Sequence, residues 1–390
     1  MKLATFLLLP ALLRETIAYT TLSDSTLQSL PSPKDDDFNI HTGKLLSPIL
    51  RTRVPGTPGQ EAVLFHFVDF FAAQLPQWKL TFQNSTSTTP TSNGRKLPFR
   101  NLIATRDPPW AESGDVGRLA LVAHYDSKME PEGFIGATDS AAPCAMLMHV
   151  ARSLDAALTA KWAAMEVEGL GKGGYDGLEE HKGIQIILLD GEEAFKVWTH
   201  TDSLYGARSL AEEWEKTYHP ALSTYQTPLA SIDLFVLLDL LGSKDPVVPS
   251  YFKTTHWAYQ LMASVEQRLR SAKILKSKPR HPFLVDAEKN QESRWGGGYI
   301  EDDHVPFMAR GVDILHIITS PFPTVWHTIN DDGEHLDLPS VEDWAMITLG
   351  FVAEWMDLEG HFDTTATTAR RARRDSVVEE EEQEDGRDEL

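Results

Sequence analysis

The chain has 390 residues, of which 42% are hydrophobic and 24% are charged, so it can build one large domain with a sizeable core or two small ones. Its formal net charge of -21 argues against nucleic-acid binding, because phosphate contacts need clustered Lys and Arg side chains. The single cysteine, Cys144, cannot form an intramolecular disulfide, and its place in an apolar run favours a buried packing residue over a nucleophile.

The N-terminal residues have the pattern of a secretory signal peptide. Lys2 precedes a mostly apolar run, residues 3–13, that is too short to span a membrane, and small residues follow near Ala18. We expect residues 1–18 to be removed. Residues 19–60 carry few periodic signals, and we expect them to form an N-terminal arm packed on the domain. No other long apolar stretch occurs, which predicts a protein without stable membrane insertion.

Short apolar runs alternate with helical patterns between residues 61 and 357. Alternation of this kind predicts one α/β domain with a mostly parallel, mixed central sheet covered by helices on both faces. Strands are expected at residues 102–104, 119–123, 184–189, 234–238 and 314–318. Helices are expected at residues 61–75, 140–154, 203–218 and 255–270, and from Ser340, with Asp343 completing a capping box. Loops are expected at residues 84–96 and 169–183, which are rich in small, polar and glycine residues.

The C-terminal residues 358–390 have the composition of a disordered tail. A basic cluster at residues 370–374 is followed by an almost wholly acidic run at 379–385. The last four residues, Arg-Asp-Glu-Leu, differ from the standard endoplasmic-reticulum retention signal by one Arg-for-Lys exchange. With the signal peptide and the glycosylation sequon at Asn84, they predict a glycoprotein of the endoplasmic reticulum lumen or secretory pathway.

Polar residues follow four of the predicted strands, where no structural need for them is evident. In open α/β sheets, ligands bind at the carboxyl ends of the strands, so these residues point to one crevice. They are His124-Tyr125-Asp126, Asp190-Gly191-Glu192-Glu193, Asp239, and His316 with Trp326-His327 soon after it.

Three of the polar residues have the chemistry of a catalytic zinc site. Taken one at a time, Glu192 and Glu193 fit a solvated acidic loop, Asp139 fits a helix N-cap, and His327 fits a hydrogen-bonded core histidine. Taken together, Asp139, Glu193 and His327 supply two oxygens and one nitrogen and leave a fourth position open. Glu192 is then free to act as a proton shuttle.

At this level of detail the chain resembles the glutaminyl-peptide cyclotransferases (glutaminyl cyclases), a branch of the clan that contains zinc aminopeptidases. The resemblance covers about residues 60–357, in order. The segments that carry it are His124-Tyr125-Asp126-Ser127-Lys128, Gly136-Ala137-Thr138-Asp139-Ser140, Pro143-Cys144-Ala145-Met146, Asp190-Gly191-Glu192-Glu193-Ala194-Phe195, Trp198, Asp202-Ser203-Leu204-Tyr205-Gly206, Leu237-Leu238-Asp239-Leu240, Asp302-Asp303-His304-Val305-Pro306-Phe307, Ser320-Pro321-Phe322-Pro323 and Val325-Trp326-His327-Thr328.

The resemblance implies an acyltransferase that closes N-terminal Gln of peptides into pyroglutamate and releases ammonia, with one zinc ion per chain. Activity on N-terminal Glu is left open, and a monomer is the default expectation. The resemblance implies that Asp139, Glu193 and His327 are the zinc ligands and that Glu192 is the general acid/base. It implies that Asp239 and Asp302 are hydrogen-bonded to each other in a catalytic network. The implied walls of the substrate pocket are Trp198, Phe322 and Trp326, with His316 beside the pocket.

Two positions depart from the family pattern. Glu301 stands where the mammalian enzymes carry Gln, and it adds a carboxylate near the pocket. The resemblance also implies a disulfide between Cys144 and the position before His124, but Ala123 fills that position. We expect this loss to lower stability and to leave activity in place.

Two other functional classes compete with this interpretation. A zinc aminopeptidase of the same clan would use His124, Asp139, Glu193, Asp239 and His327 to bind two metal ions, so a metal count separates the two activities. A non-catalytic lumenal binding protein on a degenerate peptidase fold would have lost Glu192 or a ligand, and neither is lost.

Overall fold

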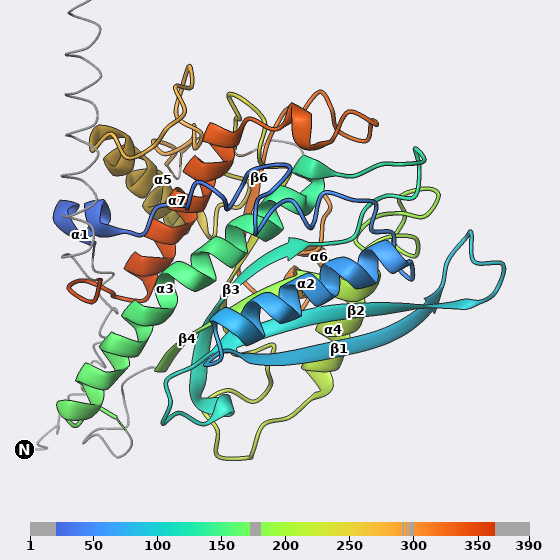
Figure 1. Ribbon diagram of the computed structural model, residues 1–390. Helices are drawn as coiled ribbons and strands as arrows, with labels where there is room; N and C mark the ends of the chain where they lie inside the picture. Colours follow the sequence, from blue (N-terminus) through green and yellow to red (C-terminus); the bar gives the residue numbers. More distant parts are fainter. Residues whose placement is uncertain (1–20, 172–180, 291, 294, 296–299, 363–390) are drawn as a thin grey trace, which may run out of the picture.

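The computed structural model describes residues 21–171, 181–290, 292–293, 295 and 300–362. Within these residues, a six-stranded sheet has the order β1-β2-β4-β3-β5-β6 (Figure 1). Strands β4, β3, β5 and β6 run parallel, and β2 is antiparallel to both β1 and β4, so the expected mostly parallel mixed sheet is confirmed. The strands are β1 (Lys79–Thr88), β2 (Lys96–Arg106), β3 (Val116–His124), β4 (His181–Leu189), β5 (Ile232–Asp239) and β6 (Ile314–Ile318).

The edge strand β1 corrects the loop predicted over residues 84–96. Its residues pair with β2 along their whole length, from Lys79↔Thr105 to Thr88↔Lys96, which leaves only residues 89–95 for the turn. Most side chains of β1 are exposed or half-buried on both faces, because the strand lies at the open edge of the sheet. Polar residues are tolerated there, so the sequence shows none of the apolar alternation that marks a half-buried strand.

Helices cover both faces of the sheet (Figure 1). One core packs α2 (Pro58–Gln74), α3 (Ala142–Val167), α5 (His256–Ser271) and α7 (Leu338–Trp355) on one face, and a second core packs α4 (Tyr205–Lys216) and α6 (Val305–Met308) on the other. On β3, Leu121 belongs to the first core and Val122 to the second. Burial on both faces therefore explains the continuous apolar runs of the central strands.

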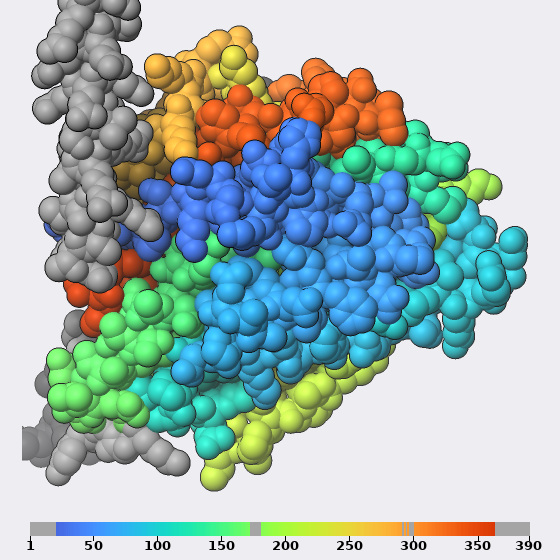
Figure 2. All heavy atoms as spheres, viewed as in Figure 1, coloured from blue at the N-terminus to red at the C-terminus, as the bar shows by residue number. Residues whose placement is uncertain are grey.

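Residues 21–57 lie across the first face and join its core. Within this segment, α1 (Asp24–Ser29) was not predicted, and Leu27 and Phe38 are buried in the core. The backbone N–H of Leu22 donates to Glu354, and Arg268 bonds to both Asp24 and Glu354. Figure 2 shows the segment, in blue, spread over the surface next to α2. Short helical turns also occur in the described part of the chain: η1 (Ser113–Asp115), η2 (Ala137–Ala141) and η3 (Gly333–His335).

The start of α7 differs from the predicted capping box. Asp337 is the N-cap and accepts a hydrogen bond from the backbone N–H of Ser340, while Asp343 accepts bonds from the backbone N–H groups of Lys276 and Ser277. The carboxylate of Asp343 thus ties a neighbouring loop to the helix instead of closing the helix end.

Several predictions fall outside the described residues. These are the signal peptide, most of the 169–183 loop, whose last residues begin β4, and the tail beyond residue 362. Among the residues that are described, no helix combines the length and hydropathy needed to cross a bilayer.

Candidate active site at the carboxyl ends of the strands

The residues that follow the parallel strands meet around one cavity of about 530 Å³. The chain continues from the end of β3 to Asp139 in η2, β4 leads into Glu192 and Glu193, β5 ends at Asp239, and His327 lies beyond β6. All five side chains line the cavity. These residues come together because the carboxyl ends of parallel strands share one edge of the sheet.

Asp139, Glu193 and His327 converge on one point of the cavity wall. The Nε2 atom of His327 lies 3.4 Å from Asp139 Oδ2 and 3.4 Å from Glu193 Oε1. These two oxygens are buried, and no described residue other than His327 is placed to donate a hydrogen bond to either of them. Burial opposes protonation of His327, but the two carboxylates outweigh it and raise the pKa of the imidazole to about 9. The arrangement attracts a cation.

The same atoms pass a test as ligands for a metal ion. One donor atom from each of Asp139, Glu193 and His327 lies within 4.8 Å of the others. Buried carboxylate oxygens without a donor carry a large desolvation cost, which coordination to a cation removes. Two carboxylates and one imidazole are also a common donor set for zinc. The three residues fit a bound metal ion.

A second group of buried ligand types, His124, Asp139 and Asp239, lies beside the first. Its atoms already satisfy one another, since His124 Nε2 lies 2.9 Å from Asp139 Oδ1. Asp239 Oδ1 accepts hydrogen bonds from the Ser140 hydroxyl and from the backbone N–H of Leu240. This group forms a hydrogen-bonded network, whereas the first group leaves two oxygens with His327 as their one candidate donor among the described residues.

Glu192 lines the cavity next to Glu193 and is held by its backbone. Asp126 accepts hydrogen bonds from the backbone N–H of Glu192 at 3.0 Å and from that of Glu193 at 3.2 Å. Burial raises the pKa of the Glu192 carboxyl well above its usual range; the His124 charge lowers it, and Glu193 and Asp302 raise it further. A buried carboxyl of this kind can hold a proton near neutral pH.

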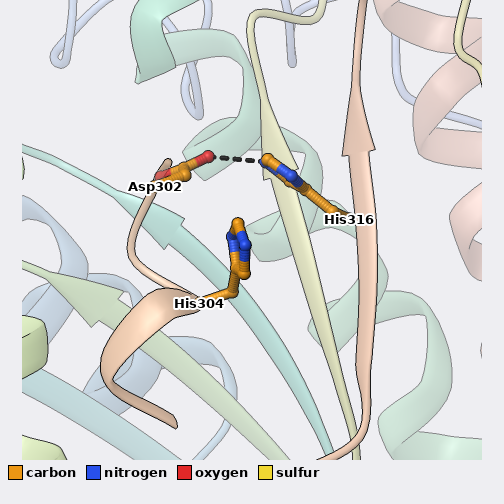
Figure 3. Close-up of side chains that lie close together, drawn as sticks. All are labelled: Asp302, His304 and His316. Atoms are coloured by element: carbon orange, nitrogen blue, oxygen red, sulfur yellow. Dashed lines mark hydrogen bonds and ion pairs between the residues drawn. The ribbon is translucent and has the colours of Figure 1, made fainter. Parts of the chain in front are cut away.

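Asp302 and His316 are the two predicted site residues that do not line the cavity. They are buried and joined at 2.7 Å between Asp302 Oδ2 and His316 Nε2, with the His304 ring 4.5 Å from the His316 ring (Figure 3). This bond holds the pKa of Asp302 below its ordinary value although burial raises it. His316 lies on β6, and His304 precedes α6.

The hydrogen bond expected between Asp302 and Asp239 is not present among the described residues. Asp302 instead bonds to His316 and to the backbone N–H of Asp303. Two ionised carboxylates cannot bond directly, because neither has a proton to donate. They interact through repulsion: burial, followed by the charge of Asp302, raises the pKa of Asp239 to about 6.

Aromatic side chains form the apolar part of the cavity wall. Trp198, Phe322 and Trp326 all line it, as expected. The Phe322 and Trp326 rings meet edge to face at 4.7 Å, and Trp326 stacks on the His327 ring at 3.9 Å. The stacking fixes the imidazole plane of a candidate ligand, and the aromatic wall restricts water around it.

Two residues that hold the site were given no role by the sequence argument. One is Asp126, whose position in the His124-Tyr125-Asp126 string after a strand was the available signal. The other is the buried Arg53, which donates to the backbone carbonyls of Ile135, Gly136 and Asp139. A distant Arg that binds backbone oxygens leaves no sequence pattern.

Cys144 is a buried free thiol on α3, as predicted. Its Sγ donates to the backbone carbonyl of His124, at 3.2 Å. Burial raises the pKa of the thiol to about 12, so it is neutral and inert in this place. Ala123 is fully buried beside it in the chain's central strand.

The chain is similar to known proteins over most of its length. It matches peptidase family M28 over residues 101–352. It is 39% identical over 323 residues to the glutaminyl-peptide cyclotransferase of Gloydius blomhoffii, with 80% of each chain covered. It is also 39% identical over 318 residues to the glutaminyl-peptide cyclotransferase-like protein of Bos taurus, with 80% of this chain and 74% of that protein covered.

The fold has the same relatives. The crystal structure of Macrostomum lignano glutaminyl cyclase aligns with a TM-score of 0.66 at 30% identity, covering 88% of this chain and 98% of that one. Sequence and structure agree, and the chain belongs to the glutaminyl-peptide cyclotransferase family, within peptidase family M28.

Proposed function

We propose that the chain is a glutaminyl-peptide cyclotransferase that uses one zinc ion to convert N-terminal Gln of peptides into pyroglutamate and ammonia. One observation carries the proposal above all. Two buried carboxylate oxygens and a ring nitrogen, from Asp139, Glu193 and His327, converge without a hydrogen-bond donor from the described residues other than His327 itself. They do so beside Glu192, in a cavity walled by aromatic rings.

The reaction forms one C–N bond and breaks another. The α-amine nitrogen of the substrate attacks the carbonyl carbon of its own γ-carboxamide, a five-membered lactam closes, and the amide nitrogen leaves as ammonia. Because amine and amide belong to one residue, proximity is largely built into the substrate. The protein must fold the side chain back and move protons.

Glu192 is the group we assign to proton transfer. It takes a proton from the attacking amine and returns it to the leaving nitrogen, so the carboxyl ends the cycle as it began. Asp239, in the cavity wall, extends the acidic cluster, and burial together with the charge of the buried Asp302 raises the pKa of both Asp239 and Glu192. Trp198, Phe322 and Trp326 bind the substrate and limit hydrolysis by excluding water.

The ligand set supports zinc as the metal and one ion as the count. Asp139, Glu193 and His327 would hold the ion, which when bound supplies a Lewis acid for the amide carbonyl. The aminopeptidase alternative needs a second ion at His124 and Asp239. Asp239 Oδ1 already accepts hydrogen bonds from Ser140 and Leu240, with which a second ion would compete at that oxygen.

Metal analysis with activity tests this function. We expect one zinc per purified chain, loss of pyroglutamate formation on chelation, and recovery with one equivalent of zinc. Asp139→Asn should lower the bound zinc and the activity together, because a neutral amide is a weaker ligand. Two zinc ions per chain, with release of free N-terminal amino acids, would instead support the peptidase.

The proposal extends to the cellular route and to the oligomeric state. We place the protein in the endoplasmic reticulum lumen as a glycoprotein, supported by the N-terminal pattern, the sequon at Asn84, which is exposed on β1, and the Arg-Asp-Glu-Leu ending. For the oligomeric state we propose a monomer, the default expectation from the sequence. Expression of the full chain in a eukaryotic host, followed by N-terminal sequencing, glycosidase treatment and light scattering, tests these points. A chain that retains residues 1–18 and carries no glycan contradicts the route.

A further inference from the structure

Glu301 occupies the exposed side of the cavity wall. Its carboxylate oxygen Oε2 accepts a hydrogen bond of 3.0 Å from the indole N–H of Trp198, and both side chains line the cavity. The bond joins two segments that are 103 residues apart. Trp198 and Glu301 therefore form one structural element of the cavity entrance, with a carboxylate on a residue that is exposed to solvent.

The two basic residues of the described cavity wall, Lys128 and His327, are half-buried and lie against the candidate metal ligands. Lys128 Nζ lies 3.4 Å from Glu193 Oε2, and His327 lies between Asp139 and Glu193. Each of these positive groups is thus next to a candidate metal ligand. The charge of Glu301 has a hydrogen bond from a neutral indole, which orients the carboxylate without neutralising it.

The proposed reaction fixes the direction in which a peptide enters this cavity, with its N-terminus first. The reacting N-terminal residue must reach Glu192, which is buried together with Glu193. The rest of the peptide leaves through the exposed side, and each further residue advances the chain by about 3.5 Å. The residue after Gln is therefore the first that can meet the Glu301 carboxylate.

We propose that Glu301 selects substrates by charge at the position after the N-terminal Gln, favouring a basic side chain and disfavouring an acidic one. The inference rests on the proposed cyclotransferase activity and adds the substrate class to it. A Lys or Arg side chain gains an ion pair with Glu301, whereas an Asp or Glu side chain meets like charge. The pair is partly exposed, so its effect is moderate and weakens with salt.

The test compares three peptides that differ only after Gln: Gln-Lys, Gln-Ala and Gln-Glu, each continued by the same neutral sequence. Their kcat/KM values are measured for the wild-type chain, Glu301→Gln and Glu112→Gln. Gln at position 301 can still accept the Trp198 hydrogen bond, so this change removes charge and keeps the bond. Glu112 is exposed near the start of β3, at the opposite end of the strands, and its change alters net charge equally.

We expect the kcat/KM of the wild-type chain to be roughly fivefold higher for Gln-Lys than for Gln-Glu at low salt. This estimate combines one attraction and one repulsion, each as strong as an exposed ion pair. The ratio should approach one in Glu301→Gln and stay at the wild-type value in Glu112→Gln. An unchanged ratio in Glu301→Gln overturns the inference and leaves the cyclotransferase activity standing. If the Gln-Lys to Gln-Glu ratio falls equally in both variants, the inference is overturned, because the preference then comes from the net charge of the protein and not from Glu301. No pyroglutamate from any peptide overturns the proposed function, and this inference with it.

Discussion

At the scale of single residues, the account depends most on Glu192. Glu192→Gln keeps the size of the side chain and removes its ability to take up and return a proton. We predict a loss of kcat of about 10²- to 10⁴-fold, the usual contribution of a general acid/base. Bound zinc should be unchanged, because Glu193 and the other ligands are untouched. Mass spectrometry of pyroglutamate in samples stopped at set times gives kcat, and metal analysis of the same samples gives the bound zinc. Turnover near the wild-type rate would contradict the role of Glu192 in proton transfer.

Asp126 should act through the two glutamates that its carboxylate holds. It accepts the backbone N–H groups of Glu192 and Glu193, and it is fully buried. In Asp126→Asn, one of these bonds is replaced by a contact between two donors, so the loop that carries the ligand should shift. We predict about 10- to 100-fold weaker zinc retention, the range found for residues that support metal ligands. Competition with a chromophoric chelator gives the affinity, and unchanged affinity would limit Asp126 to folding.

At the scale of elements, the segment that carries Asp139 is held by a residue far away in the sequence. The guanidinium of Arg53 donates to the carbonyls of Ile135, Gly136 and Asp139 from a fully buried position. Replacement by Met removes all three hydrogen bonds, and among the described residues only the Gly136 carbonyl keeps another donor, the backbone N–H of Ala141. Each such loss costs about 1–3 kcal/mol, so we predict a stability decrease of several kcal/mol together with weaker zinc retention.

A matched variant separates these two effects. Arg106 is also buried, and it bonds to Asp155 and Thr159, at the end of β2 that pairs with the start of β4, away from the cavity. Arg106→Met should lower the free energy of unfolding and leave zinc retention unchanged. Denaturant titrations with metal analysis compare the two, and equal zinc loss in both variants would show that Arg53 has no special relation to the site.

The elements also show what a sequence can reveal about this fold. The buried strands β3 to β6 and the residues after them were predictable, because burial on both faces gives apolar runs and parallel strands bring their ends together. β1 was missed because an edge strand needs no apolar pattern. The N-cap of α7 was misassigned, since Asp343 and Asp337 have the same side chain and only tertiary contacts decide which one caps the helix.

The candidate metal ligands were predictable from the sequence, whereas the residues that hold them in place were not. The residue types and motif strings pointed to Asp139, Glu193 and His327, which the structure brings together. The partners of Asp302 were not predictable, because a contact between a carboxylate before α6 and an imidazole on β6 depends on packing. Backbone-binding residues such as Arg53 and Asp126 escaped for the same reason.

At the scale of the whole molecule, acid stability should depend on a histidine remote from the cavity. His149 is fully buried in α3; burial, followed by the charge of Arg152, lowers its pKa to about 3. In the unfolded chain its pKa is about 6.5. The folded state therefore resists protonation, and its stability falls as the pH drops from about 6.5 toward 3.

The matched variant His149→Gln removes this titration. Between pH 7 and pH 4 we predict that the wild-type chain loses roughly 3 kcal/mol more unfolding free energy than the variant, from the difference between the two pKa values. Urea titrations at the two pH values measure it. Parallel pH dependence of the two chains would contradict a buried neutral His149.

The most direct measurement of the central claim is product analysis on a peptide with N-terminal Gln. The purified chain is incubated with the peptide, and the products are followed by mass spectrometry with an ammonia assay. The account predicts a loss of 17 mass units (the mass of ammonia, about 17 Da) from the peptide, one ammonia per pyroglutamate formed, as expected for an intramolecular attack. Release of free Gln with a shortened peptide would contradict it and assign the site to peptide-bond hydrolysis.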